Sequence, residues 1–292
     1  MAQRKITDLF AEKPRTLSFE FYPPRTQKGL AKLVESTAPE LAELGADYFS
    51  VTYGAGGSES KATMNVVTGL LDRLDVPVMH HLTCIKHTFA SVRAELAEMK
   101  SAGVRNIMAL RGDPPAAEPD YVPGPDQPRW GCDLVGIIRE YGDWFSIGVP
   151  AFPETHPLAM APEIDTKVLR VKQQMGADFA VTQLFFEPGL YKTFLDRARA
   201  GGVDFRIIPG ILPVTNYARL LEFCDMCGAS VPDSIHQRFA SIAEDAEATG
   251  RAGIDHAVQL CGDLLDAGAP GIHFYCLNKT QPVTEIVRQL GL

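Results

Sequence analysis

The sequence contains no segment that would place the protein in a membrane or on a nucleic acid. No apolar run reaches the roughly 18 to 20 residues that a membrane-spanning helix needs, and the opening MAQRKITDLFAEKPR has no hydrophobic signal core. No block of lysine and arginine offsets the net charge of −8, so the attraction to phosphates that dominates nucleic-acid binding is weak. We therefore expect a cytoplasmic protein without a membrane or nucleic-acid partner.

Several signatures of common catalytic and metal sites are also missing. The six cysteines are scattered over 292 residues and do not form a disulfide framework. Cys224 and Cys227 lack the second pair that a zinc site needs, and we interpret them as helix-packing residues. The sequence has neither the H-x-H of a metal-dependent barrel hydrolase nor a lysine on a late strand for Schiff-base chemistry. No metal site is predicted.

Short β-rich apolar runs recur along the chain, and a helical stretch follows each of them. The eight runs cover residues 17–21, 48–52, 78–83, 106–110, 145–149, 179–185, 205–209 and 271–275. The intervening stretches have apolar residues at three- and four-residue spacing and tend to end at glycine, as helices do. Eight such units predict an α/β fold, a (β/α)8 TIM barrel, with a doubly wound parallel sheet as the alternative.

Two segments add to the minimal barrel. Residues 3–10 predict a short extra helix before the first strand, and residues 232–267 predict a helical insertion before the last strand. With these additions the whole length is used, so we expect residues 1–292 to form a single barrel domain. The loop 112–131 after the fourth strand is proline-rich, and long loops in compact domains are more often functional than idle.

Polar side chains gather at the carboxyl ends of the predicted strands, where barrels of this kind carry their chemistry. Glu20 stands between two phenylalanines in the first strand. Burial would raise the pKa of its carboxyl towards the working pH, which suits a general acid; the alternative is a structural carboxyl paired with Arg25 or Arg111. Asp113 can reach over the barrel mouth or simply form a turn before the following prolines.

Three further features allow two interpretations each. The glycine-rich segment 54–58 can admit a diphosphate to backbone N–H groups, but it lacks nucleotide-binding spacing and is better explained as a turn. Gln183 can bind the edge of a heterocycle or be a satisfied core amide. His81 and His156 are expected to hydrogen-bond a ligand or the backbone rather than a metal.

Eight strand-end motifs, in order, resemble those of the methylenetetrahydrofolate reductase family of the bacterial, single-domain type. They are LSFEFYPPRT, SVTYGAGGS, HLTCI, ALRGDPP, PETHP, VTQLFF, IPGILPVTNY and HFYCLNK, and together they span essentially the whole chain. The resemblance implies a (β/α)8 barrel that holds FAD at its C-terminal mouth. It implies ping-pong hydride transfer from NADH or NADPH through FAD to 5,10-methylenetetrahydrofolate, giving 5-methyltetrahydrofolate. Because the family commonly self-associates, it also implies a homo-oligomer.

The resemblance assigns roles to individual residues. Glu20 matches the catalytic acid that helps open the folate ring to an N5 iminium, and Asp113 matches a carboxylate near flavin and pterin that stabilises this cation. The positions matching the FAD site are Thr52, Tyr53, Ala55, His81, Arg111, Gly112, Asp113, His156, Asp165 and Lys172. The positions matching the substrate site are Gln183, which orients the pterin, Tyr217, which can stack on either substrate, and Lys279, which can contact the folate.

The sequence departs from the family pattern in the FAD site. Residues 58–63 read SESKAT where relatives often carry an Asp-Arg pair, and Val168 and Val171 stand where relatives have polar FAD contacts. Two alternatives to a flavin-dependent reductase therefore stay open. One is a flavin-independent folate reductase of the same fold, and the other is a non-catalytic barrel that binds folate.

Overall fold

Parallel strand segments form a closed barrel in the computed structural model, which describes residues 2–53, 60–115 and 117–292. The strands are β1 (Thr16–Phe21), β2 (Tyr48–Val51), β3 (Val78–Thr83), β4 (Asn106–Leu110), β5 (Ser146–Ala151), β6 (Phe179–Thr182), β7 (Arg206–Ile208), β8 (Gly210–Ile211) and β9 (Gly271–Tyr275). Their spatial order is β7-β6-β5-β4-β3-β2-β1-β9-β8. The predicted barrel is confirmed, and the doubly wound sheet is wrong.

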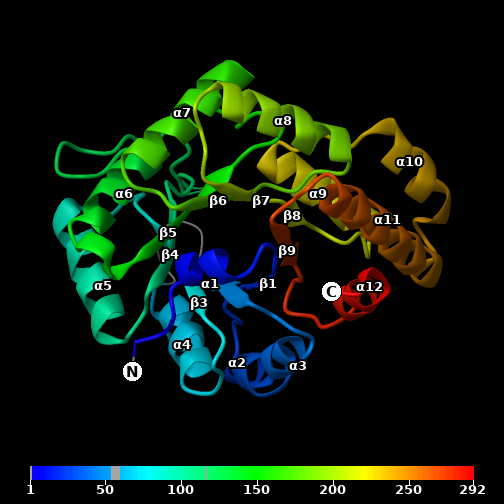
Figure 1. Ribbon diagram of the computed structural model, residues 1–292, viewed down its shortest axis with the longest axis horizontal. Helices are drawn as coiled ribbons and strands as arrows, with labels where there is room; N and C mark the ends of the chain where they lie inside the picture. Colours follow the sequence, from blue (N-terminus) through cyan, green and yellow to red (C-terminus); the bar gives the residue numbers. More distant parts are fainter. Residues whose placement is uncertain (1, 54–59, 116) are drawn as a thin grey trace.

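The ring closes through a divided seventh strand. β7 pairs with β6, β8 pairs with β9, and only Pro209 separates β7 from β8 along the chain. Proline has no N–H to donate to a ladder, which explains why the predicted run 205–209 continues as two short segments. The two halves together occupy one strand position between β6 and β9 (Figure 1).

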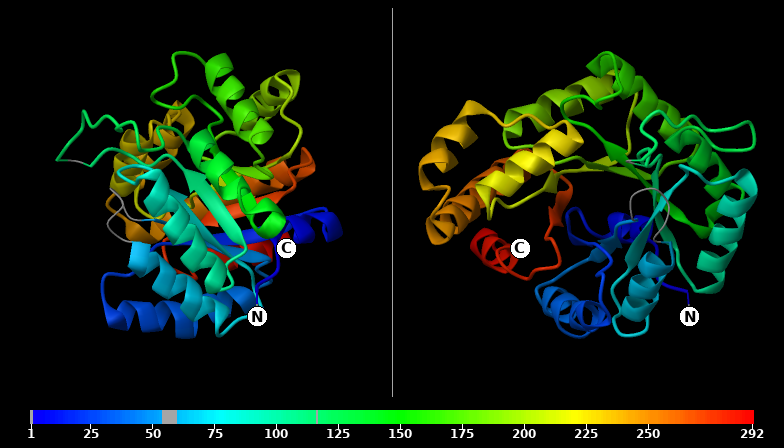
Figure 2. Two further views of the ribbon diagram at one scale, coloured as in Figure 1. Left: turned by 90° about the vertical axis from the view of Figure 1, so that its left-hand side faces the viewer. Right: turned by 180° about the vertical axis from the view of Figure 1, so that it is seen from behind.

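Helices surround the barrel (Figures 1 and 2). In chain order they are α1 (Ile6–Glu12), α2 (Gln27–Lys32), η1 (Leu33–Thr37), α3 (Ala38–Glu43), α4 (Ser60–Leu71), α5 (Phe89–Ser101), α6 (Gly131–Arg139), η3 (Gly142–Trp144), α7 (Pro162–Gln174), α8 (Pro188–Ala200), α9 (Tyr217–Cys227), α10 (Asp233–Phe239), η4 (Ala240–Ile242), α11 (Ala246–Asp266) and α12 (Val283–Leu290). No helix in the described ranges is long and apolar enough to cross a membrane.

The predicted leading helix is present as α1, and it closes the N-terminal end of the barrel. Its Ile6 and Leu9 are buried in one cluster with inward-facing residues of the strands, among them Met79 and Phe179. The helix begins at residue 6 rather than residue 3 because the side chain of Gln3 instead hydrogen-bonds both backbone groups of Val78, at 2.6 and 2.8 Å.

The predicted insertion before the last strand, residues 232–267, contains α10, η4 and α11. α11 lies in the helix ring in contact with α8 and α12, in the position of a regular barrel helix (Figure 1). α9 precedes the predicted insertion; it and α10 form an added layer and share an apolar cluster that includes Leu220, Ile235 and Phe239. This added layer follows β8 and therefore starts at the C-terminal end of the barrel.

Alternation along the strands sorts residues between the lumen and the helix layer. In β1, Leu17, Phe19 and Phe21 belong to the main core under the helices, so Ser18 and Glu20 face the lumen. In β9, Ile272 and Phe274 belong to the same core, so the side chains at 273 and 275 face inward. The lumen near the C-terminal strand ends is therefore polar.

Candidate active site

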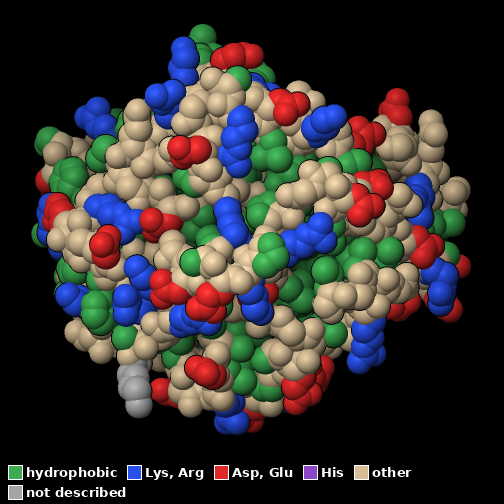
Figure 3. Space-filling model, viewed as in Figure 1, with side chains coloured by type: hydrophobic (Ala, Val, Ile, Leu, Met, Phe, Trp, Pro, Cys, Tyr) green, Lys and Arg blue, Asp and Glu red, His purple; other side chains and the backbone are tan. Residues whose placement is uncertain are grey.

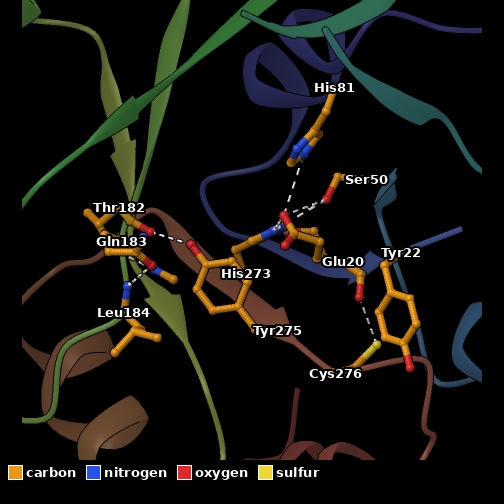
Figure 4. Close-up of polar contacts among 12 residues, drawn as sticks. Glu20, Tyr22, Ser50, His81, Thr182, Gln183, Leu184, His273, Tyr275 and Cys276 are labelled. Atoms are coloured by element: carbon orange, nitrogen blue, oxygen red, sulfur yellow. Dashed lines mark hydrogen bonds and ion pairs between the residues drawn. The ribbon is translucent and has the colours of Figure 1, made fainter. Parts of the chain in front are cut away.

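The carboxylate of Glu20 lies at the centre of a group of polar side chains inside the barrel (Figure 4). Its Oε2 atom lies 3.3 Å from Oγ of Ser50, 3.5 Å from Nε2 of His273 and 3.4 Å from Nε2 of His81. Strand register explains the grouping, because Glu20 pairs with Ser50 on β2, and β9 flanks β1 on its other side. The arginine-paired alternative for Glu20 is not what the structure shows.

The surroundings of Glu20 decide its charge. Burial acts to raise the pKa of its carboxyl, but the hydrogen bond with His273 and the proximity of His81 bring that pKa below its ordinary value. Burial lowers the pKa of His81, against the opposing effect of Glu20. The expectation of a raised pKa for Glu20 is therefore wrong, because the sequence does not show that two imidazoles lie beside the carboxyl. Glu20 is ionised at neutral pH and needs a proton before it can act as an acid.

His273 is held in place from three sides. Its Nδ1 lies 2.8 Å from Oγ of Ser18, while Tyr48 stacks on the ring at a centroid distance of 6.1 Å. Tyr275 meets the ring edge-on at 5.5 Å. Sequence reasoning missed Ser18, Ser50 and His273. The alternation of polar and aromatic residues in LSFEF and GIHFY was a signal that could have found Ser18 and His273.

The turn after β4 depends on a glycine. Gly112 has a φ of +82°, and a Cβ there would lie 2.7 Å from Ile85 and 2.9 Å from Thr83, so other residues would be strained. The turn carries Asp113, which is exposed and close enough to His156 to act on its pKa. Oγ1 of Thr83 is buried beneath the turn without a hydrogen-bond partner in the described chain. A ligand at the mouth could therefore satisfy this hydroxyl.

Four residues matched to the FAD site lie close enough to influence one another's pKa. They are Arg111, His156, Asp165 and Lys172. The backbone N–H of His156 donates to Asp165 at 3.1 Å, and Nζ of Lys172 donates to the carbonyl of Pro150 at 3.3 Å. Burial lowers the pKa of Lys172 to about 8, against the opposing charge of Asp165. The pKa of His156 is lowered by burial, and the charges of Arg111 and Lys172 lower it further.

The N-terminus of α6 lies next to the backbone of Arg111 and the side chain of Lys172. A Cβ at Gly131, the first residue of α6, would lie 3.6 Å from the backbone nitrogen of Arg111 and 3.7 Å from Cε of Lys172. The absence of a side chain leaves this approach clear. N–H groups at a helix start beside a lysine form a donor set that suits a diphosphate.

Gln183 lies near Tyr275, beside the polar side chains that surround Glu20 (Figure 4). Its Oε1 accepts from the N–H of Leu184 at 2.9 Å, which turns the chain away and ends β6 earlier than predicted. The hydroxyl of Tyr275 donates to the carbonyl of Thr182 at 2.5 Å, and this bond links the strand of His273 to the strand of Gln183. Lys279 is exposed after β9.

Other predicted site residues point elsewhere. Tyr217 is 9% exposed, and it stacks on Phe239 and hydrogen-bonds His236, so stacking on a substrate would require this packing to open. Tyr53 is 8% exposed and its hydroxyl donates to Glu95 at 3.1 Å, away from the lumen. Thr52 is half-buried at the end of β2.

Two further parts of the predicted FAD site are the glycine-rich segment 54–58 and the valines of α7. The glycine-rich segment, with Ala55, lies outside the described residues, so its two interpretations stay open. Val168 and Val171 are 43% and 42% exposed on α7. Within the described ranges, no group of three or more histidine, cysteine, aspartate or glutamate side chains is arranged to hold a metal ion.

Comparisons with known sequences agree on one family. The family model described as methylenetetrahydrofolate reductase matches residues 5–291. The 5,10-methylenetetrahydrofolate reductase of Salmonella typhimurium is 36% identical over 277 residues, which cover 94% of this chain and 90% of that protein. A probable methylenetetrahydrofolate reductase (NADH) of Oryza sativa is 33% identical over 298 residues, 99% of this chain and 50% of the plant protein.

A solved structure supports the fold. It is described as an uncharacterized protein from Clostridium thermocellum that binds two copies of 5-methyl-5,6,7,8-tetrahydrofolic acid. The TM-score is 0.64 and the match covers 98% of this chain and 97% of the other. At 14% sequence identity, this likeness concerns the architecture alone.

Proposed function

The chain belongs to the methylenetetrahydrofolate reductase family and is an oxidoreductase, and from this premise we propose how it works. Hydride passes from NADH or NADPH through bound FAD to 5,10-methylenetetrahydrofolate, giving 5-methyltetrahydrofolate in two alternating half-reactions. The observation that carries this proposal is the pairing at one barrel mouth of a carboxylate–imidazole group around Glu20 with a cationic group around Lys172. We also propose that the enzyme acts in the cytoplasm as a homo-oligomer, as the family resemblance implies.

The residues at the mouth fit FAD. Arg111, Lys172 and the N-terminus of α6 would hold its diphosphate, with His156 and Asp165 at their side. The unpartnered hydroxyl of Thr83 offers a further hydrogen bond. When bound, FAD supplies the chemistry of accepting a hydride from one substrate and giving it to the next.

Glu20 delivers a proton to the ring nitrogen that leaves when the five-membered ring of the folate opens. Because the pKa of Glu20 is below its ordinary value, the carboxylate must first receive that proton. His273 is in position to supply it, since its Nε2 lies 3.5 Å from Oε2 of Glu20 and its Nδ1 is held by Ser18. General acid catalysis of this kind contributes typically about 10²- to 10⁴-fold to a rate.

The remaining polar residues position and stabilise the substrate. Asp113 places a negative charge at the mouth, where it stabilises the iminium cation formed on ring opening. Gln183 presents its carboxamide to the pterin, which offers both donors and acceptors. Lys279, exposed beyond β9, contacts the folate farther out.

A purification experiment tests the proposal. The protein should be yellow from bound FAD, and it should bleach anaerobically when NADH or NADPH is added and recover its colour with methylenetetrahydrofolate. Colourless protein that still reduces the folate would favour a flavin-independent reductase. Protein that stays colourless and inactive with added FAD would favour a folate-binding module. Titration with each nicotinamide in turn identifies the donor.

A further inference from the structure

A second group of polar side chains lies outside the lumen, between the barrel and its helices, and the roles proposed above make no use of it. At its centre is Glu95, which lies on α5 and is 9% exposed. The hydroxyl of Tyr53 donates to its carboxyl group, with oxygen distances of 3.1 and 3.3 Å, and the hydroxyl of Ser60, the first residue of α4, donates to it as well. Nδ1 of His87 lies 3.8 Å from the same carboxyl group.

Glu95 is shielded from solvent and from the cations of the surface. On the face in Figure 3, acidic side chains lie exposed among lysines and arginines. Within the part of the chain that the structure describes, Glu95 has no lysine or arginine partner, and its ion-pair neighbour is His87. A buried carboxyl group is costly unless donors surround it, so Glu95 holds the side chains of Tyr53, Ser60 and His87 in fixed positions.

Tyr53 links this group to the mouth of the barrel. Alternation along the chain places the side chain of Thr52 on the side of the lumen, while Tyr53 belongs to the core under the helices. The backbone N–H of Thr52 donates to the carbonyl of Phe21 at 2.8 Å, and its carbonyl accepts from Oγ1 of Thr63 at 3.0 Å. Glu95 therefore holds the end of β2 from behind.

His87 links the same group to the turn that carries Arg111. Its backbone N–H donates to the carbonyl of Cys84 at 3.2 Å. The N–H groups of Cys84 and Ile85 both donate to the carbonyl of Arg111, at 3.2 and 2.9 Å. The group thus contacts the chain segments that follow β2 and β3, and residues matched to the FAD site lie on or beside both of them.

We propose that Glu95 is a positioning residue for the flavin, an inference that rests on the proposed function. By accepting from Tyr53 and Ser60, Glu95 fixes the end of β2 and the start of α4, and with them Thr52 at the edge of the FAD site. FAD then meets a mouth that already has its binding geometry. Without this carboxyl group, part of the binding energy would be spent on ordering these segments.

Release of FAD from the holoprotein tests this without turnover. Protein saturated with FAD is diluted stepwise, and the fluorescence of the released flavin gives the dissociation constant. Glu95→Gln and Tyr53→Phe should each weaken FAD binding by about 10-fold, as expected for the loss of one hydrogen bond. The double variant should lose much less than the product of the two single losses, because the two side chains act as one unit. Glu98→Gln, at an exposed glutamate of the same helix, is the matched control and should bind FAD as the wild type does.

Urea unfolding of the same variants separates positioning from stability. Leu9→Ala, at a buried leucine at the opposite end of the barrel, should lower stability and leave the dissociation constant of FAD unchanged. Tyr53→Phe keeps the buried ring, so it tests the inference even if Glu95→Gln does not fold. Unchanged FAD affinity in Tyr53→Phe, or single losses that multiply in the double variant, would overturn the inference alone.

Two further outcomes would also count against it. If Leu9→Ala lost as much FAD affinity as Glu95→Gln, the affinity would follow stability and Glu95 would have no positioning role. If the wild type bound no FAD, the flavin-dependent function would fail and the inference with it.

Discussion

The two ends of the barrel are built from the same strands but with different chemistry. On β3 the inward residue is Met79 at the N-terminal end and His81 two residues later. On β6 the inward Phe179 is apolar, and the polar Gln183 follows the end of the strand. At the first end α1 packs apolar side chains against these strands, whereas at the second end a carboxylate meets two imidazoles. The apolar end stabilises the closed ring, so the mouth can keep polar groups in arrangements that serve a substrate.

This division predicts that the same kind of change has different consequences at the two ends. A lesion at the N-terminal end should lower the free energy of unfolding and leave turnover intact. A lesion at the mouth should change turnover or binding and leave stability nearly intact. The largest effect is expected at the mouth.

Replacing Glu20 by glutamine should slow folate reduction by at least about 10²-fold, because the amide keeps the shape of the side chain but cannot deliver a proton. Reduction of the flavin by the nicotinamide donor should be spared, since it needs no proton at that place. Stopped-flow absorbance of each half-reaction measures the two rates separately. Equal loss in both half-reactions would remove the acid role from Glu20.

Replacing Leu9 by alanine should lower the free energy of unfolding by about 2 to 5 kcal/mol, the usual cost of truncating a buried leucine. Leu9 is 5% exposed in the cluster that α1 forms with the strands. Urea unfolding measures the loss, and kcat should be unchanged at temperatures where the variant is folded. Leu158→Ala, at a leucine that is 63% exposed, is the control. A parallel loss of kcat in the folded variant would show that the two ends are coupled.

The apolar end was the easier one to predict from sequence. The bounds of β3, β4 and β9 equal the predicted runs, because short β-rich runs between helical stretches define a buried strand. The other five runs differ from the observed strands in their bounds, two of them for local reasons that the structure shows. Pro209 divides the seventh strand, and the side chain of Gln183 ends the sixth by bonding the next N–H.

At the mouth, the types of residue could be predicted from the sequence, but the contacts between their side chains could not. Strand-end position and family resemblance identified Glu20, and neither could show that His273 lies against it from a strand 253 residues away. That contact depends on ring closure, which places β9 beside β1. The direction of the pKa shift of Glu20 depends on the same contact, so burial alone gave the wrong sign.

Replacing Asp113 by asparagine should lower the rate of folate reduction on the order of tenfold, equivalent to about 1.4 kcal/mol of transition-state stabilisation. The physical reason is loss of the negative charge that stabilises the iminium cation. The potential of the bound flavin should also shift, which spectroelectrochemistry measures. Asp126→Asn, an exposed aspartate on the same loop, is the matched control. An unchanged potential would leave Asp113 as a turn residue only.

The smallest effect concerns the pH dependence of FAD binding. Burial lowers the pKa of Lys172 to about 8, so its ammonium is charged at pH 7 and mostly neutral at pH 9. Affinity for the FAD diphosphate should therefore fall as pH rises through this range, by about 5-fold for the loss of one such ion contact. Quenching of flavin fluorescence gives the dissociation constant at each pH. Lys172→Arg should flatten the profile because a guanidinium stays charged, whereas Lys167→Arg, at an exposed lysine of the same helix, should not. If the profile kept its slope in Lys172→Arg, the titrating group would lie elsewhere and Lys172 would not be the diphosphate contact.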